Sequence, residues 1–387
     1  MNPILTRTVV LLGAVSLFTD LASEMLYPIL PIYLESIGFG VIGIGVLEGI
    51  AEATSGLSKG YFGQWSDRLG RRRPFVVWGY GLSAVAKPLL VLFLSPVWIL
   101  FTRTLDRFGK GIRTGARDAL LSGEAVPETK ARVFGFHRSM DTLGAALGPL
   151  VALMFLYFYP GQYRWLFFLA VVPGLLAVVA TLLLTEKPTE RVVGARPGLL
   201  EFAGYWRRAT PAYRRLVVGL AGFALINSSD MFLLLYLKDA GLTDVAVIGY
   251  YVFYNLVYAV AAYPFGSLAD RFGPKRMFLF GLLCFGLVYA ILPYAVSFFA
   301  FTFLFLIYGL FAAATDGVAK AWITHTCAQA DTATAIGAYS ALASLCSLVA
   351  SSAAGGIWYG FGPTAMLTLT AAATVGIVAY FLGTRAR

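Results

Sequence analysis

Long apolar runs separated by short polar turns fill almost the whole chain. A helix needs about 20 apolar residues to cross the hydrocarbon core of a bilayer. Runs close to that length occur at residues 8–35, 40–62, 75–95, 97–120, 134–158, 164–184, 215–237, 245–265, 277–295, 298–319, 333–358 and 363–383. This pattern predicts twelve membrane-spanning helices, and therefore an all-α integral membrane protein.

The composition agrees with this pattern. Of the 387 residues, 59% are hydrophobic and only 13% are charged, whereas a soluble domain has about 25% charged residues. The first apolar run could be a signal peptide, but Asp20 and Glu24 occupy the place where a small-residue cleavage site would stand. We therefore interpret this run as the first span.

Lysine and arginine gather in alternate loops. They follow span 2 (Arg68, Arg71, Arg72, Arg73), span 4 (Lys130, Arg132) and span 8 (Arg271, Lys275, Arg276), and they recur between spans 6 and 7 (Arg191, Arg196, Arg207, Arg208, Arg214, Arg215). Because such loops stay in the cytoplasm, we expect both termini and the central linker to be cytoplasmic, in a plasma membrane of the bacterial inner-membrane type. The asymmetry also explains the net charge of +10, so we expect no nucleic-acid partner.

One long polar segment, residues 185–214, divides the spans six and six. We predict an N-terminal six-helix half (1–184), a cytoplasmic linker (185–214) and a C-terminal six-helix half (215–387). Within the linker, LLEFAGYWRR has an apolar side and an arginine end, which suits a short helix on the membrane surface. A disordered linker is the alternative.

The two halves are repeats of one another. GQWSDRLGRRR at 63–73 recurs as GSLADRFGPKR at 266–276, and IYLESIG at 32–38 recurs as LYLKDAG at 235–241, both with an offset of 203 residues. Paired repeats around a site at the bilayer midplane are the architecture of secondary transporters.

The segment from Gly63 to Arg72 resembles the signature loop between helices 2 and 3 of the major facilitator superfamily. The resemblance implies two six-helix bundles around a central cavity, and a gate role for the aspartate of this loop. We extend that role to a group of charged residues near the cytoplasmic end. These are Asp67, Arg68, Arg72, Arg113, Arg117, Asp118, Asp270 and Arg271.

Two further motifs bear on transport. Gly144-Ala-Ala-Leu-Gly148-Pro149 in span 5 is similar to the helix-5 motif of antiporters that export drugs or metabolites, which implies export. Leu100-x-x-Arg103-x-x-Asp106-Arg107-x-Gly109 resembles the helix-4 motif linked to proton transfer, with Asp106 and Arg107 replacing the usual glutamine and glycine. Uptake or facilitated transport of an organic anion, a metal chelate or a lipid-like metabolite is the alternative.

Charged side chains inside the spans are the candidate site, because each costs at least about 2.5 kcal/mol at the bilayer centre. Asp20 and Glu24 share a helix face, and with Asp141 and Asp230 they are the predicted proton-coupling residues. The predicted substrate-binding residues comprise a stripe of charges in span 4, acids of span 2, Arg138 and polar residues of the second half. They are Arg103, Asp106, Arg107, Lys110, Arg138, Glu48, Glu52, Tyr251, Tyr254, Asn255, Tyr258 and Asn227. A salt-bridge network with a purely structural role is the competing interpretation.

The sequence argues against an enzyme. It has two histidines and lacks the GxSxG, HExxH and phosphate-loop motifs. We expect no catalytic residues, no cofactor and no metal, and no disulfide among Cys284, Cys327 and Cys346. The expected partners are a small anionic or amphipathic solute, protons and the lipid bilayer, and we expect a monomer.

Overall fold

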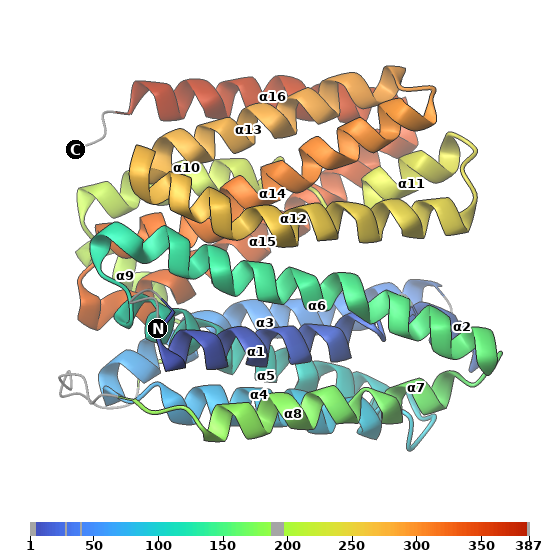
Figure 1. Ribbon diagram of the computed structural model, residues 1–387, viewed down its shortest axis with the longest axis horizontal. Helices are drawn as coiled ribbons and strands as arrows, with labels where there is room; N and C mark the ends of the chain where they lie inside the picture. The colour runs from blue at the N-terminus through green and yellow to red at the C-terminus, as the bar shows by residue number, and fades with distance from the viewer. Residues whose placement is uncertain (1–4, 28, 39–40, 187–196, 385–387) are drawn as a thin grey trace. The chain divides into compact units, whose positions relative to one another are not determined.

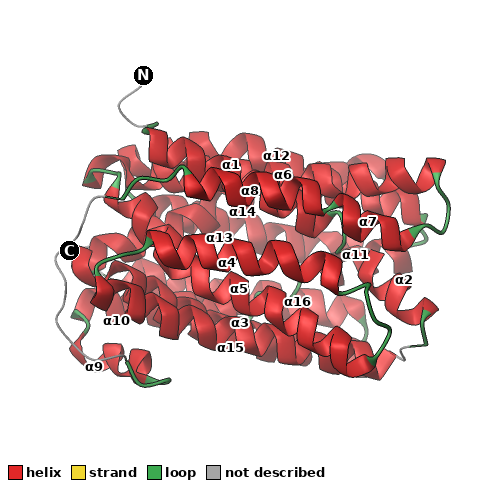
Figure 2. Cartoon of the chain, turned by 90° about the horizontal axis from the view of Figure 1, so that it is seen from below, coloured by secondary structure: helices red, strands yellow, loops and turns green. Residues whose placement is uncertain are grey.

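The computed structural model describes residues 5–27, 29–38, 41–186 and 197–384, and within these ranges it contains helices and no strand (Figures 1 and 2). The chain forms two compact units. Unit 1 runs to Val126 and adds Met140–Arg208 and Cys327–Ala341, while unit 2 comprises Pro127–Ser139, Ala209–Thr326 and the chain from Leu342 onward. Each unit thus includes a short segment from the opposite half of the sequence.

Unit 1 contains the first six spans and the linker helices. Its elements are α1 (Arg7–Glu24), α2 (Ile29–Ser36), α3 (Val41–Leu69), α4 (Arg73–Leu89), α5 (Pro96–Gly123), most of α6 (Lys130–Phe158), α7 (Tyr163–Leu169), α8 (Val171–Leu182), η2 (Glu201–Gly204), α9 (Tyr205–Arg208) and η4 (Gln329–Asp331).

Unit 2 contains the last six spans. Its elements are η1 (Pro127–Thr129), α10 (Pro211–Ala224), α11 (Met231–Asp239), α12 (Asp244–Phe272), α13 (Pro274–Ile291), η3 (Leu292–Tyr294), α14 (Phe298–Thr326), most of α15 (Thr332–Phe361) and α16 (Pro363–Gly383).

The helix neighbours repeat between the units. In unit 1, α5 packs against α3 and α4, and α8 packs against α1 and α4. In unit 2, α14 packs in the same way against α12 and α13, and α16 against α10 and α13. The duplication read from the sequence therefore extends to the packing within each unit.

Seven of the described helices are long and apolar enough to cross a membrane by length and composition alone. The remaining five predicted spans fall short of that measure for physical reasons. Two are broken, at α1–α2 and α10–α11; α4 has only 17 residues; and α3 and α5 carry many charges. The charges that keep α3 and α5 below this measure include residues of the candidate site.

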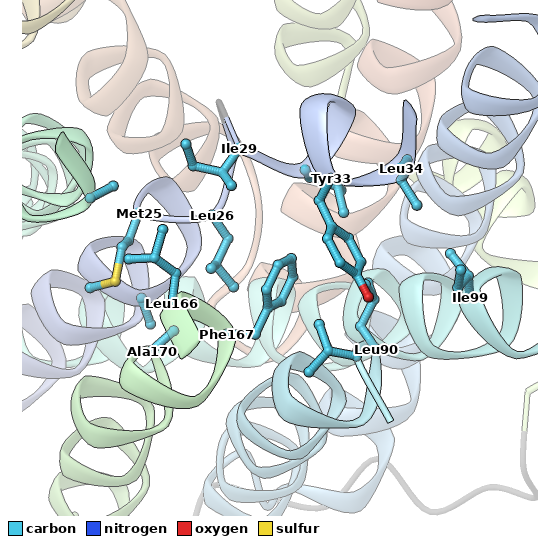
Figure 3. Packing of buried hydrophobic residues seen from close by; sticks show 14 of the residues in the cluster. Met25, Leu26, Ile29, Tyr33, Leu34, Leu90, Ile99, Leu166, Phe167 and Ala170 are labelled. Atoms are coloured by element: carbon cyan, nitrogen blue, oxygen red, sulfur yellow. The ribbon is translucent and has the colours of Figure 1, made fainter. Parts of the chain in front are cut away.

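The break after α1 lies over an apolar cluster in unit 1. Met25, Leu26 and Tyr33 are buried there with Leu166 and Phe167 of α7 (Figure 3). The Tyr33 and Phe167 rings lie 5.3 Å apart, centroid to centroid. This cluster adjoins the cavity described next, because Leu26 and Phe167 also line that cavity.

Candidate transport site and latches

A charged cavity of about 90 Å³ lies within unit 1, between α1, α4 and α5. Five cationic side chains line it (Lys87, Arg103, Arg107, Lys110, Arg113), together with the three acids Asp20, Glu24 and Asp106. The stripe predicted on span 4 therefore faces a cavity, and the lining carries more positive than negative groups.

Asp106 is the acid most closely surrounded by cations. Its carboxylate lies 3.5 Å from Lys87 Nζ and 3.5 Å from an Arg103 guanidinium nitrogen. Lys87 also donates to the Ser83 carbonyl at 3.2 Å. These contacts pair Asp106 with Lys87 and Arg103, as the competing structural interpretation expects.

Arg113, which the sequence assigned to the gate, lines the charged cavity. Its guanidinium donates to Ser83 Oγ at 2.7 Å, and its Cζ lies 4.2 Å from the centroid of the Tyr80 ring. Two turns of α4 therefore hold Arg113 at the cavity. Nearby, Arg117 forms a 2.8 Å ion pair with Asp118, its neighbour in sequence.

A second group of acids meets where α1 packs on α6. Ser16 Oγ donates to Asp141 Oδ1, and the carboxyl groups of Asp20 and Asp141 are hydrogen-bonded to each other. Two ionised carboxylates that adjoin each other repel, and a proton shared between them removes that repulsion. Lys110 and Glu24 act electrostatically on the same Asp20 group.

The helix-5 motif explains this close approach. A Cβ placed on Gly144 would lie 2.4 Å from the Leu17 carbonyl oxygen, and one on Gly148 would lie 2.6 Å from the Met25 nitrogen. Both contacts are too close for any side chain. Glycine at these positions thus lets α6 present Asp141 to α1.

The acids of span 2 lie differently. Glu52 pairs with Lys59 at 3.9 Å, is half exposed, and interacts electrostatically with Lys110 and Arg107 of the cavity. The Glu48 side chain lies outside the described part of the chain. Glu52 thus lies close enough to the stripe to interact with it electrostatically, while its ion pair is with Lys59 of its own helix.

Unit 2 holds a carboxylate in an aromatic surrounding. Asp230, at the break between α10 and α11, accepts hydrogen bonds from Tyr254 (2.7 Å) and Tyr308 (2.6 Å). The nearby amide oxygen of Asn227 is buried without a hydrogen-bond partner. This cluster brings together two predicted residues, Asp230 and Tyr254, that the sequence had assigned to different roles.

The other predicted residues of the second half face different partners. Tyr258 donates to Asp316 at 2.8 Å, and Asp316 lies 3.8 Å from Arg138. Arg138 thus belongs to unit 2, whereas Asp141 belongs to unit 1. Asn255 donates to the Tyr251 carbonyl of its own helix at 2.9 Å.

The signature aspartate Asp67 caps a helix. Residues 63–69 are the end of α3 and not a loop. Asp67 Oδ2 accepts from the backbone N–H of Thr334 (2.7 Å) and from its hydroxyl (2.9 Å), at the start of α15, while Arg72 lies 3.2 Å from Oδ1. A carboxylate at a helix N-terminus satisfies free N–H groups and matches the helix dipole.

Unit 2 repeats this arrangement. Asp270 accepts from the N–H groups of Ala131 and Arg132, both at 2.9 Å, at the start of α6. Asp270 is offset from Asp67 by 203 residues, and Thr334 from Arg132 by 202. We call the two arrangements the unit 1 latch and the unit 2 latch. Arg271 is exposed at the end of α12 and stacks on Phe272, its neighbour in sequence.

Three glycines bring the backbones together at each latch. In unit 1 they are Gly63, Gly115 and Gly337, and in unit 2 Gly266, Gly317 and Gly135. A Cβ on Gly337 would lie 2.4 Å from the Lys59 carbonyl oxygen, and one on Gly135 would lie 2.4 Å from that of Ala262. Both latches therefore depend on direct contact between helix backbones.

The described part of the linker is ordered against α3. Phe202 and Tyr205 are buried, and a Cβ on Gly60 would overlap the Phe202 ring at 2.5 Å. Glu201 forms an ion pair with Arg68. The short helix predicted for LLEFAGYWRR thus exists as η2 and α9, but its aromatic side packs on protein; residues 187–196 of the predicted linker lie outside the described chain.

Several site residues were missed from the sequence. Ser16, Tyr308 and Thr334 are uncharged and look ordinary in a membrane helix, while Glu201 lies in a polar segment where an acid is common. Only a comparison of the two repeats could have pointed to Thr334. Thr334 corresponds to Arg132 in the other repeat, and the backbone N–H of each donates to the latch aspartate of its unit.

Paired six-helix repeats, a charged intramembrane cavity and backbone latches together define a secondary active transporter, a multi-pass membrane protein and not an enzyme. The Major Facilitator Superfamily model matches residues 12–255 and 244–387. The chain is 33% identical over 363 residues to an uncharacterized MFS-type transporter of Methanocaldococcus jannaschii, covering 92% of this chain and 89% of that one. The protein belongs to the Major Facilitator Superfamily.

Solved structures share the fold. The human organic anion transporter MFSD10 (TETRAN) superimposes with a TM-score of 0.78 at 18% identity, covering 97% of this chain and 99% of that chain. The Escherichia coli fucose:proton symporter FucP superimposes with a TM-score of 0.78 at 13% identity and 98% coverage of both chains. At these identities the likeness concerns the fold alone.

Proposed function

We propose that the protein moves small organic anions across the membrane, and that a proton held between Asp20 and Asp141 travels with the anion. The carboxyl–carboxyl hydrogen bond between these two residues is the observation that carries the proposal. Such a pair can share one proton, and it would carry two negative charges on losing it.

The anion is proposed to bind the cationic side of the cavity. Arg103, Arg107 and Lys110 face a space where Asp106 already neutralises part of the charge. The surplus of cations favours an anionic group, and guanidinium groups bind carboxylates and phosphates in a bidentate manner. The name of the structural neighbour MFSD10, an organic anion transporter, is consistent with this substrate class.

The sign of the coupling follows from Lys110. It interacts electrostatically with Asp20, with Glu52 and with the neighbouring Arg107. When the Asp20–Asp141 pair holds its proton, Lys110 has less negative charge beside it and attracts a substrate anion more strongly. Proton and anion therefore favour each other's binding, and such reciprocal coupling is that of a symporter.

Export is the second candidate function. It rests on the Gly144–Pro149 motif, whose glycines bring α6 against α1 at the proton-holding pair. An exporter that exchanges anions for protons needs the two to compete for the site. The direction of proton movement thus separates the candidates.

We would reconstitute the protein in liposomes that contain a pH-sensitive dye and impose an inward gradient of radiolabelled mono- and dicarboxylates. Symport acidifies the lumen as label enters, and exchange makes it alkaline. Asp20→Asn and Asp141→Asn should abolish the pH change, whereas Asp239→Asn, an exposed acid outside the cavity, should not.

The same liposomes test the substrate class. Arg107→Ala should lower carboxylate flux, while the cation tetraphenylphosphonium should not be carried by the wild type. A normal pH change in both Asp20→Asn and Asp141→Asn would refute the proton-carrying role of the Asp20–Asp141 pair. Normal carboxylate flux in Arg107→Ala, with lower thermal stability, would favour the structural interpretation of the stripe.

A further inference from the structure

A second cavity, of about 610 Å³, opens at one end of unit 2, far along the chain from the charged cavity of unit 1. It lies where α10 and α13 begin and where α12, α14 and α16 end. This volume is within the range of about 300–1,000 Å³ that is typical of ligand sites. None of the functions proposed above uses it.

The lining combines basic and apolar side chains. Arg215, Lys275 and Arg276 supply three positive charges, and none of the described residues that line the cavity is acidic. Trp322, Leu279 and the buried Phe381 form the apolar wall. Lys275 donates to the Thr384 carbonyl, which holds its ammonium group at the cavity.

The start of α13 adds a partial positive charge. Its N-cap is Gly273, which has no side chain that could cap the helix. The first N–H groups of a helix have no partner within it and attract anions. Lys275 and Arg276 stand in this first turn, so their charges and the helix dipole act at the same place.

An exposed apolar stripe runs from this cavity along α13. It starts at Arg276 and continues through Phe280, Leu283, Leu287 and Ile291, at intervals of three or four residues. These four apolar side chains are 42–61% exposed. Residues at this spacing share one helix face, so an apolar chain could lie along α13 from the basic cavity.

We propose that this cavity binds the headgroup of an anionic phospholipid, whose phosphate contacts Lys275, Arg276 and Arg215 while its acyl chains follow the α13 stripe. Basic pockets between membrane helices are suited to anionic headgroups. The stripe lets the acyl chains of a lipid pack along α13 while its phosphate stays in the cavity, which a soluble phosphate could not do, and the competition with glycerol phosphate below separates the two.

The test is native mass spectrometry of the full chain, purified in detergent and titrated with dioleoylphosphatidylglycerol or dioleoylphosphatidylcholine. We expect the anionic lipid to bind more tightly than the zwitterionic one. In Lys275→Gln/Arg276→Gln its affinity should fall about 25-fold, since each basic residue near a lipid surface contributes about five-fold. Arg207→Gln/Arg208→Gln removes the same charge from exposed linker positions and should bind as the wild type does.

Two further measurements keep the proposal refutable. Arg215→Gln alone should weaken binding about five-fold, even if the double variant fails to fold. Glycerol phosphate should not displace the bound phosphatidylglycerol. The proposal would be overturned by equal affinity for the two lipids or by an unchanged affinity in the folded variants. Displacement by glycerol phosphate would also overturn it, because the cavity would then be a site for a soluble phosphate.

Discussion

Replacing Gly337 with alanine tests whether the unit 1 latch depends on backbone contact. The new Cβ would lie 2.4 Å from the Lys59 carbonyl oxygen, whereas Cβ atoms essentially never come closer than 3.0 Å to another heavy atom. The α15 segment and α3 must therefore separate by at least 0.6 Å (3.0 − 2.4). The contacted atom is backbone, so no side-chain rotation can relieve the overlap.

Overpacking of this kind costs about 1–3 kcal/mol. If the latch opens and closes during transport, that cost falls on the closed state alone. A difference of about 1–3 kcal/mol changes an equilibrium by roughly 5- to 150-fold. The open population should therefore rise at least about five-fold.

Cys327 offers a natural probe of opening. It is the first residue of the unit 1 segment Cys327–Ala341, which contains the start of α15, and it interacts electrostatically with Tyr205 of the linker. With Cys284 and Cys346 replaced by alanine, the rate of maleimide labelling reports access to Cys327. We expect Gly337→Ala to label several-fold faster than its parent.

Gly356→Ala is the matched control, because it lies on the same helix and its Cβ would meet nothing within 4 Å. Both changes raise helix propensity by the same amount, about 1 kcal/mol, so this effect cancels in the comparison. Equal labelling of the two variants would refute the backbone-contact reasoning. Slower labelling of Gly337→Ala would do so as well.

Two other predictions concern single ion pairs. Asp106→Asn leaves Lys87 buried without its carboxylate partner, so it should lower the free energy of unfolding by about 3–5 kcal/mol, as measured by thermal unfolding. The double variant Lys87→Met/Asp106→Leu removes both charges and should recover part of that loss. A double variant as unstable as the sum of its two single changes would contradict this. The pKa of the Glu201 carboxyl is lowered, first by the Gly198 N–H and then by Arg68. Its contribution to linker docking is thus present above the ordinary glutamate pKa of about 4.3 and is lost only as the pH falls through the lowered value. Hydrogen exchange of the linker helices, corrected for intrinsic rates, should show equal protection at pH 7 and pH 5, while Glu201→Gln should lose protection at both.

The spans and the repeat could be predicted because both leave local signals. Apolar runs report the part of a helix that crosses hydrocarbon, and a duplicated motif needs no knowledge of contacts. The same signals missed the ends and interruptions of helices. The sequence predicts one continuous span at residues 8–35, yet α1 ends at Glu24 and α2 begins at Ile29. Hydropathy does not indicate a break that falls between apolar residues.

For the site, the sequence could predict only which residues share one face of a helix. The spacing of Arg103, Arg107 and Lys110 placed them on one side of α5, and that side lines the cavity. Their partners depend on where helices cross, which the spacing on one helix does not encode. Arg138, for example, pairs with Asp316 of α14, a partner that the spacing on α6 alone could not show.

The two halves have kept the latches alike and the cavity chemistry different. Gly63, Gly115 and Asp67 have equivalents at Gly266, Gly317 and Asp270. A latch made of backbone contacts tolerates no side chain in either copy, so both copies are held to the same residues. A polar wall has no such restriction, and unit 1 carries the cationic stripe while unit 2 carries the Asp230–tyrosine cluster.

This division makes α6 the element that can link proton binding to latch opening. Its first turn is capped by Asp270 of the unit 2 latch, and further along it carries Asp141 of the proton-holding pair. The ten helical steps from Ala131 to Asp141 span about 15 Å of continuous helix. If the proposed proton leaves the Asp20–Asp141 pair, repulsion between the two carboxylates acts on α6 directly.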